Sequence, residues 1–219
     1  TVSRLRTSRR SFVRVVGTVG MRRPKRPTVD LLVAFAAVFA LQQVAGVVGV
    51  GVEWFALATP FRRPWTLVTT VYAHATLGHL LANAVGVVVV GLLLERTTTR
   101  VRFHGFVLVT GVVSALAEFL VGAALGTPVA VLGASGAVLA GVGYLLAGNR
   151  VAGGVLSRVD LGRRGSAALL IGVAVAVTLL TAGPGVAVVA HFTGFAVGAV
   201  AGRTGVLHVG RRTARVDRV

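Results

Sequence analysis

The sequence contains no cysteine, and only 13% of its 219 residues are charged. Without cysteine, the chain can form no disulfide, no thiolate metal site and no cysteine nucleophile. Apolar residues make up 55% of the chain and give a mean hydropathy of +0.85. A soluble domain of this length rarely reaches such values, so the composition predicts an all-α polytopic membrane protein.

Six apolar segments are present, at about residues 30–52, 76–94, 103–123, 132–147, 166–183 and 186–202. The first has no charge from Leu31 to Val50, which is long enough for a helix to cross a hydrocarbon core of about 30 Å. We interpret it as a retained helix rather than a cleaved signal peptide. We therefore expect a six-helix membrane domain over residues 29–203, with basic tails at residues 1–28 and 204–219.

Positive charge lies between the apolar segments and gives the chain a net charge of +17. With the amino terminus inside, 21 of the 23 lysines and arginines fall on the cytoplasmic side, and only Arg62 and Arg63 fall outside. This bias predicts that both termini are cytoplasmic and that the protein lies in the cell membrane. Because aromatic residues are few and do not alternate with arginine, we expect no nucleic-acid partner. We expect the tails to bind anionic lipid headgroups.

The outer loop at residues 53–73 contains both tryptophans of the chain, Trp54 and Trp65, and two prolines. Tryptophan favours the headgroup level of a bilayer, so the loop is expected to lie in the membrane interface.

The sixth apolar segment contains a histidine in line with glycines. His191, Gly194, Gly198 and Gly202 are spaced by three, four and four residues, so they share one helix face. Glycines on such a face allow a neighbouring helix to approach closely. The sequence therefore predicts that His191 points into the bundle at the outer end of a close helix contact.

The fourth apolar segment provides the matching partner, because Ser135 stands in it between Gly133 and Gly136. Ser135 and His191 both lie towards the outer ends of their segments, at similar depth. A hydroxyl and an imidazole brought together in this way can act as a nucleophile and its general base. The alternative for His191 is a core histidine that donates to a backbone carbonyl.

The second apolar segment contributes His79 and Asn83, four residues apart on one helix face, and His74 lies just before it. This spacing does not fit a zinc motif, and no third ligand is apparent, so we expect no metal. A buried imidazole and amide are better suited to stabilise an oxyanion.

Other polar residues have simpler interpretations. Glu118 is expected to snorkel or to bond a loop, and Gln42 and Gln43 are expected to bond across helices or to face the first loop. No acidic residue is expected near His191, so the sequence favours a dyad over a triad.

These residues resemble the motifs of the rhomboid intramembrane serine proteases, over roughly residues 30 to 202. Gly133-Ala134-Ser135-Gly136 is similar to the family's Gly-x-Ser-Gly, at the start of the fourth helix. The remaining matches are Ala190-His191 with Gly194 and Gly198; His74, His79 and Asn83; and Gly91 with Glu95 in a Gly-x-x-x-Glu element.

The resemblance implies that Ser135 is the nucleophile and His191 its base, and that Asn83, His79 and the Ser135 N–H form the oxyanion hole. It implies a structural role for Glu95. The expected activity is cleavage of single-span membrane proteins through an acyl-enzyme, without a cofactor. Two alternatives are a catalytically silent rhomboid-like protein that binds membrane clients and, less favoured because no inverted repeat is evident, a small transporter.

Three positions depart from the family pattern. Trp65 is followed by Thr66 rather than arginine, and Leu139 occupies a position that often holds an aromatic residue stacked on the histidine. Thr99 stands where a small residue is usual. The first two changes concern the loop geometry and the orientation of the imidazole, and none removes a catalytic group.

Overall fold

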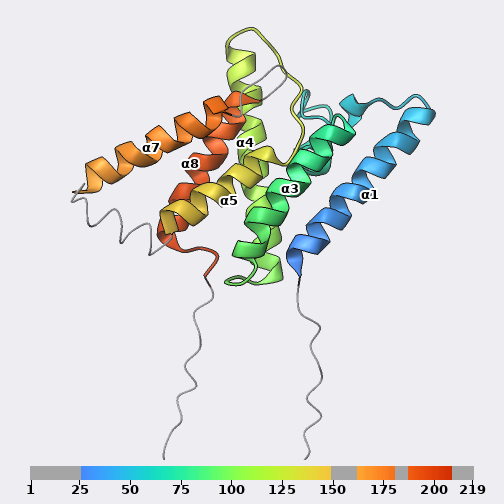
Figure 1. Cartoon of the computed structure of the whole chain (residues 1–219). Helices are drawn as coiled ribbons and strands as arrows, with labels where there is room; N and C mark the ends of the chain where they lie inside the picture. The colour runs from blue at the N-terminus through green and yellow to red at the C-terminus, as the bar shows by residue number, and fades with distance from the viewer. Residues whose placement is uncertain (1–25, 149–161, 181–186, 209–219) are drawn as a thin grey trace, which may run out of the picture.

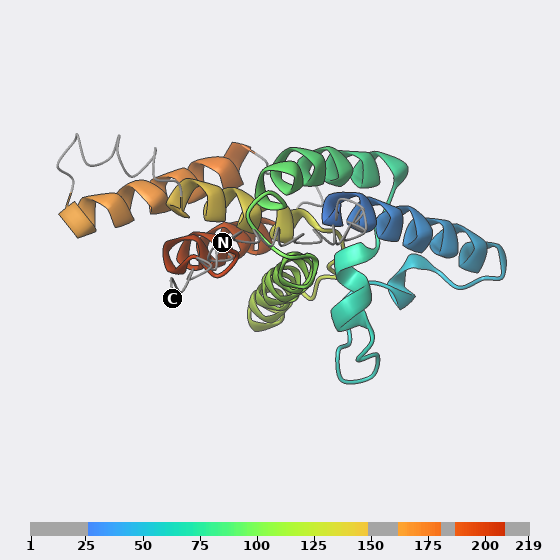
Figure 2. The same cartoon turned by 90° about the horizontal axis from the view of Figure 1, so that it is seen from below.

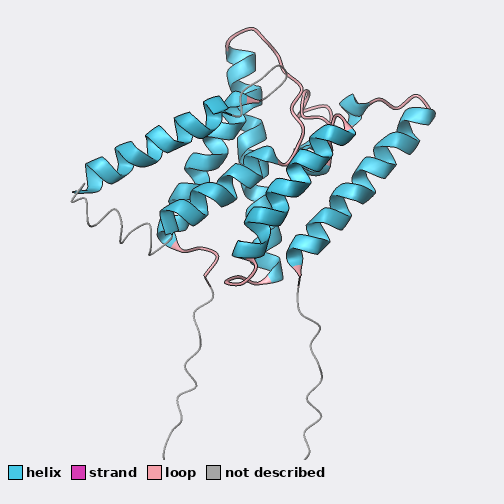
Figure 3. Ribbon diagram, viewed as in Figure 1, coloured by secondary structure: helices cyan, strands magenta, loops and turns pink. Residues whose placement is uncertain are grey.

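The computed structural model describes residues 26–148, 162–180 and 187–208, and its regular elements are all helices (Figure 3). An isolated β-bridge between Leu57 and Val131 is the one extended pairing among these residues. In chain order the helices are α1 (Pro27–Val47), the 3₁₀ turn η1 (Val52–Trp54), α2 (Thr66–Tyr72), α3 (Leu77–Leu94), α4 (Arg100–Ala124), α5 (Ser135–Gly148), α7 (Gly162–Leu180) and α8 (Val188–Thr204).

Each of the six apolar segments corresponds to one helix: α1, α3, α4, α5, α7 and α8. Three of them, α1, α3 and α4, are long and apolar enough to cross a membrane, whereas α5 and the Arg164–Leu179 part of α7 are apolar but shorter. The all-helical membrane architecture is confirmed, and the count of six spans stays a prediction. The basic tails predicted at residues 1–28 and 204–219 lie almost wholly outside the described residues.

Helix α2 lies within the stretch that we interpreted as an outer loop. Its seven residues are too few for a recognisable apolar period. Tertiary contacts stabilise it instead, because Thr66, Thr70 and Val71 are buried against the bundle. The stretch at residues 53–73 is therefore partly helical and packed rather than a simple loop.

The start of α1 and the end of α8 lie at the same end of the bundle, with the α3–α4 connection beside them (Figure 1). Side chains join these segments. Arg100 Nε is 2.7 Å from Asp30 Oδ2, and an Arg102 Nη1 donates to the His208 carbonyl over 2.9 Å. Helix α2 and the loop before it lie towards the opposite end. Seen from below, that loop projects sideways beyond the helices (Figure 2).

Two helices begin with threonine caps of their own. Thr76 accepts a hydrogen bond from the His79 N–H at the start of α3, and Thr99 accepts one from the Arg102 N–H at the start of α4. Thr99, which stands where a small residue is usual in the family, therefore caps α4.

Helix α1 has no capping side chain of its own. Glu95, at the end of α3, supplies the acceptor from outside: its Oε2 accepts from the Thr28 N–H at 3.2 Å and from the Thr28 hydroxyl at 2.7 Å. Gly91 allows this approach, because a Cβ there would lie 2.7 Å from Thr28 Oγ1. The Gly-x-x-x-Glu element therefore fastens α1 to α3.

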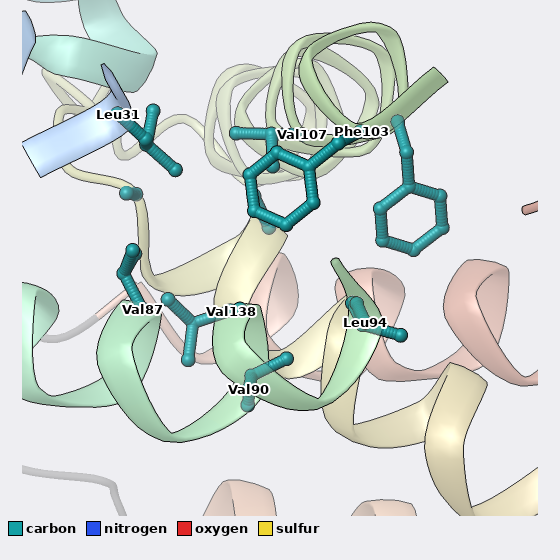
Figure 4. Close-up of a pocket in the computed structure, with 11 residues that line it drawn as sticks. Leu31, Val87, Val90, Leu94, Phe103, Val107 and Val138 are labelled. Atoms are coloured by element: carbon teal, nitrogen blue, oxygen red, sulfur yellow. The ribbon is translucent and has the colours of Figure 1, made fainter. Parts of the chain in front are cut away.

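The interior between α1, α3, α4 and α5 is apolar. The side chains from these helices point towards one another around a small cavity of about 20 Å³ (Figure 4). A pocket lined almost entirely by carbon offers water few hydrogen-bond partners. Its lining residues are Leu31, Val87, Val90, Gly91, Leu94, Phe103, Phe106, Val107, Ala134, Ala137 and Val138.

Helices α5 and α8 make the most extensive helix contact, and glycine lines it. A Cβ at any of three successive glycines of α8 would collide with a carbonyl oxygen of α5. The pairs are Gly194 with Gly136, Gly198 with Ala140, and Gly202 with Tyr144. The glycine face predicted for the sixth segment is therefore a backbone-to-backbone contact. We call it the glycine seam.

A methyl group in the glycine seam should force the two helices apart. We expect Gly198→Ala to lower the free energy of unfolding by about 1–3 kcal/mol, the usual cost of overpacking. The matched control is Gly105→Ala on α4, where a Cβ meets nothing within 4 Å. It should leave stability unchanged or raise it by up to about 1 kcal/mol, since alanine is the better helix former. Thermal unfolding in detergent compares the two, and equal effects would contradict the close contact.

Candidate active site

Ser135 is the first residue of α5, and the segment before it is fixed on both sides. Leu57 and Val131 exchange backbone hydrogen bonds of 2.8 and 3.1 Å. From α2, the Thr70 hydroxyl donates to the Val131 carbonyl over 2.5 Å, and the Thr70 carbonyl accepts from the Gly133 N–H at 2.8 Å. The stretch at residues 53–73 thus determines where α5, and with it Ser135, begins.

Gly133 adopts a conformation that favours glycine, with φ of +114°. Its α-carbon also faces the His79 ring, since a Cβ would lie 2.6 Å from His79 Cε1 and 2.7 Å from Nε2. Both backbone strain and lack of space therefore require glycine here. The consequence is that the His79 imidazole lies beside the chain two residues before Ser135.

His191 lies in the first turn of α8 and is buried. Its Nε2 is 2.9 Å from Ser135 Oγ. In the tautomer that carries its proton on Nδ1, Nε2 accepts the serine hydroxyl proton in this hydrogen bond. The structure therefore brings together the two residues that spacing alone placed at similar depth.

The sequence did not indicate that an acidic side chain contacts the residue before His191, and the choice of a dyad over a triad stays a prediction. Glu118 of α4 reaches α8, where its Oε2 accepts from the Ala190 N–H at 2.8 Å. Glu118 thus bonds the start of a helix rather than snorkelling. No local pattern indicates this pairing, because Glu118 and Ala190 are 72 positions apart.

Asn83 is buried and donates from Nδ2 to the His79 carbonyl over 2.9 Å, within its own helix. This bond fixes the side-chain rotamer on the face that also holds His79. The N–H groups at the start of α5 have no acceptor within that helix, because the first turn of an α-helix leaves its donors free. Together these are donors that an oxyanion at Ser135 could use.

His74 is almost fully buried, with 1% exposed, in the connection between α2 and α3. Its ring packs edge-on against the rings of Phe35 and His79, with centroid distances of 4.9 and 5.3 Å. Within the described residues, neither ring nitrogen has a hydrogen-bond partner. Burial, with a smaller contribution from His79, lowers the pKa of His74 to about 4, so the ring is neutral at neutral pH.

Gln42 fixes the backbone at His74. Its Nε2 donates to the His74 carbonyl over 3.3 Å, and its Oε1 accepts from the His74 N–H at 3.1 Å. Gln42 therefore bonds from α1 to the connection between α2 and α3 rather than to another helix, while Gln43 is exposed.

The stretch at residues 53–73 has an arginine–tryptophan contact, although Thr66 rather than arginine follows Trp65. The Arg63 guanidinium lies 4.1 Å from the Trp54 ring centroid and donates to the Glu53 carbonyl. Trp65 stacks on the other tryptophan and donates from Nε1 to the Trp54 carbonyl over 3.0 Å. Thr66 is buried and bonds the Arg63 carbonyl. The loop before α2 is therefore held by specific contacts, although Thr66 occupies the position where the family often has arginine.

Leu139 is buried and belongs to an apolar cluster with Ala174, Phe195 and Ala199. It therefore fills the space between α5, α7 and α8.

In the part of the chain that the structure describes, no group of three or more His, Cys, Asp or Glu residues could hold a metal ion.

The arrangement combines a hydroxyl, a hydrogen-bonded imidazole and several free donors at the start of a helix. These are the components of nucleophilic catalysis on a carbonyl group. The roles of the individual residues stay predictions, since distances alone do not measure activity.

Comparison with known proteins agrees with this geometry at the level of the family. A protein-family model described as Rhomboid domain matches residues 62–207, well over half of the chain. The matched range contains helices α2 to α8 and every candidate active-site residue named above. A search of curated proteins gave no match.

The depressed pKa of His74 should make stability depend on pH. The unfolded chain binds a proton at His74 near the ordinary pKa of 6.5, whereas the folded protein binds it only near 4. Protonation therefore favours the unfolded state as the pH falls from about 6.5 to about 4. The free energy of unfolding should decrease by up to about 3 kcal/mol across this window.

His74→Phe is the matched variant, because it keeps an aromatic ring and the Gln42 bonds to the backbone. The difference in stability between wild type and this variant, measured by thermal unfolding from pH 7 to pH 4, should change with pH as described. A difference that is independent of pH would contradict the burial of a neutral His74.

Proposed function

Since the chain belongs to the rhomboid family, we propose that this multi-pass membrane protein is an intramembrane serine protease. The observation that carries the proposal is the 2.9 Å contact between Ser135 Oγ and His191 Nε2. Its substrates are single-span membrane proteins, as the family resemblance implies. No cofactor takes part.

The proposed reaction has two proton transfers in each half. His191 Nε2 takes the Ser135 hydroxyl proton while Oγ attacks the scissile carbonyl carbon. The imidazolium then gives this proton to the departing amine as the C–N bond breaks, which leaves an acyl-enzyme. In the second half, His191 takes a proton from water, the hydroxide attacks the ester, and the proton returns to Ser135 Oγ as the carboxylic acid leaves.

The negative charge that develops on the carbonyl oxygen needs donors. We assign this role to the Ser135 N–H, His79 and Asn83. The support for it is that α5 begins at Ser135, where the helix dipole favours negative charge, and that His79 lies against Gly133. Loss of one such donor typically costs about 2.7–4 kcal/mol of transition-state stabilisation.

We further propose six spans with both termini in the cytoplasm, in the cell membrane. The short α5 would extend about 21 Å at 1.5 Å per residue, which is less than the hydrocarbon core. This length is acceptable because α3, α4 and α8 surround α5, so its ends need not meet lipid. The active site would then lie towards the outer leaflet, and the basic tails would contact anionic lipid on the inner side.

The proposal is tested by reconstituting the protein into liposomes with a fluorogenic single-span peptide that has small residues at its cut and a helix-breaking glycine-proline pair. Wild type should cleave it, whereas Ser135→Ala and His191→Ala should lower the rate by about 10³ or more. The matched controls are Ser166→Ala on α7 and His104→Ala on α4, which should keep the wild-type rate.

The competing function is a silent rhomboid-like protein that binds membrane clients. It is favoured if folded wild-type protein binds the peptide without cleaving it. Equal cleavage by wild type and Ser135→Ala would instead mean that another group is the nucleophile.

A further inference from the structure

Helix α8 starts without a cap of its own. The residue before it, Ala187, has no side chain that can accept a hydrogen bond. The first N–H groups of any α-helix lack acceptors within the helix, and the first turn unwinds readily when they are left unpaired. His191 lies in this turn, with its own N–H bonded to the Ala187 carbonyl. The position of the imidazole therefore depends on an intact first turn.

The three α8 glycines of the seam, Gly194, Gly198 and Gly202, lie beyond this turn. From α5, Gly136 packs against the turn, since a Cβ there would lie 3.5 Å from the Ala190 carbonyl oxygen. The seam fixes the body of α8 against α5, but His191 stands one turn ahead of it. The packing of Gly136 gives the N–H groups of this turn no acceptor, so an acceptor must come from another element.

Glu118 makes that contact from α4. It lies on the same face as Thr110 and Ser114, at intervals of four residues. Both hydroxyls donate to carbonyls of their own helix, over 2.7 Å each. Glu118 is the member of this row that reaches another helix, with its 2.8 Å bond to the Ala190 N–H. A carboxylate at a helix amino terminus also interacts favourably with the helix dipole.

We infer that Glu118 is a positioning residue for the catalytic histidine: it caps α8 from outside and holds His191 within reach of Ser135 Oγ. The inference rests on the proposed protease function. Glu118 does not touch the reacting atoms in this role, and it acts through the peptide group that precedes His191.

The chain contains a natural comparison for this role. Helix α1 also lacks its own cap, and Glu95 accepts from its Thr28 N–H in the same manner. This second contact joins the start of α1 to the end of α3 and involves neither α5 nor α8. Glu95→Ala therefore removes an equivalent helix cap while leaving the Ser135–His191 pair in place.

Two measurements separate the contact from its effect on catalysis. The first is amide hydrogen exchange at Ala190 in the full-length protein. In wild type this N–H should be protected from exchange, although it lies in a first helix turn. This expectation can be tested without any variant. The second is the cleavage rate of the fluorogenic single-span peptide in liposomes, expressed per folded protein.

In Glu118→Ala, exchange at Ala190 should become about tenfold faster and cleavage about tenfold slower, the size of a typical cap effect. Glu118→Gln keeps an oxygen acceptor of the same reach, so it should restore most of both values. Glu95→Ala should lower the melting temperature but keep Ala190 exchange and the cleavage rate within about twofold of wild type.

An unprotected Ala190 N–H in wild type would overturn the inference, even where Glu118→Ala does not fold. The inference also fails if Glu118→Ala speeds exchange without slowing cleavage, or if Glu118→Gln is as impaired as Glu118→Ala. A wild-type protein that does not cleave the peptide refutes the protease function, and with it the catalytic part of this role. The exchange result still decides separately whether Glu118 caps α8.

Discussion

The geometry of the site depends on one constraint, the backbone contact between α5 and α8. Carbonyl oxygens of α5 lie where side chains of α8 would stand, and glycine at positions 194, 198 and 202 is what makes this possible. Two helices in such contact have little freedom to rotate about their axes or to slide, because small shifts produce collisions between backbones. The bodies of the two helices are thereby fixed relative to each other, with Ser135 at the start of α5 and His191 one turn before the first glycine of the seam.

Other contacts fix the parts of the site that the glycine seam does not hold. Thr70 and Leu57 fix the segment before α5, so the stretch at residues 53–73 positions Ser135. The starts of α1 and α8 have no capping side chain of their own, and glutamates from neighbouring helices accept hydrogen bonds from their N–H groups. In an apolar bundle, unpaired backbone N–H groups are costly. A carboxylate that accepts hydrogen bonds from them stabilises the fold and also fixes the position of the helix start.

Features with a local or periodic signal could be predicted from the sequence. The six apolar segments correspond to helices within a few residues, and the spacing of His191 with the glycines indicated the face that meets α5. The pairing of Ser135 with His191 followed from that face and from their similar depth. The contacts of Glu118 and of Arg63 could not be found this way, because each joins side chains to backbone or rings whose positions only the folded chain determines. Helix α2 was missed for a related reason, since tertiary packing rather than its own sequence stabilises it.

The central claim is that His191 activates Ser135 and no other hydroxyl. The most direct test is to treat the membrane-embedded protein with an alkyl fluorophosphonate, which modifies activated serines, and to locate the adduct by peptide mass mapping. The account predicts a single adduct on Ser135 in wild type and none in folded His191→Ala. Unmodified wild-type protein, or an adduct on a different serine, would contradict it.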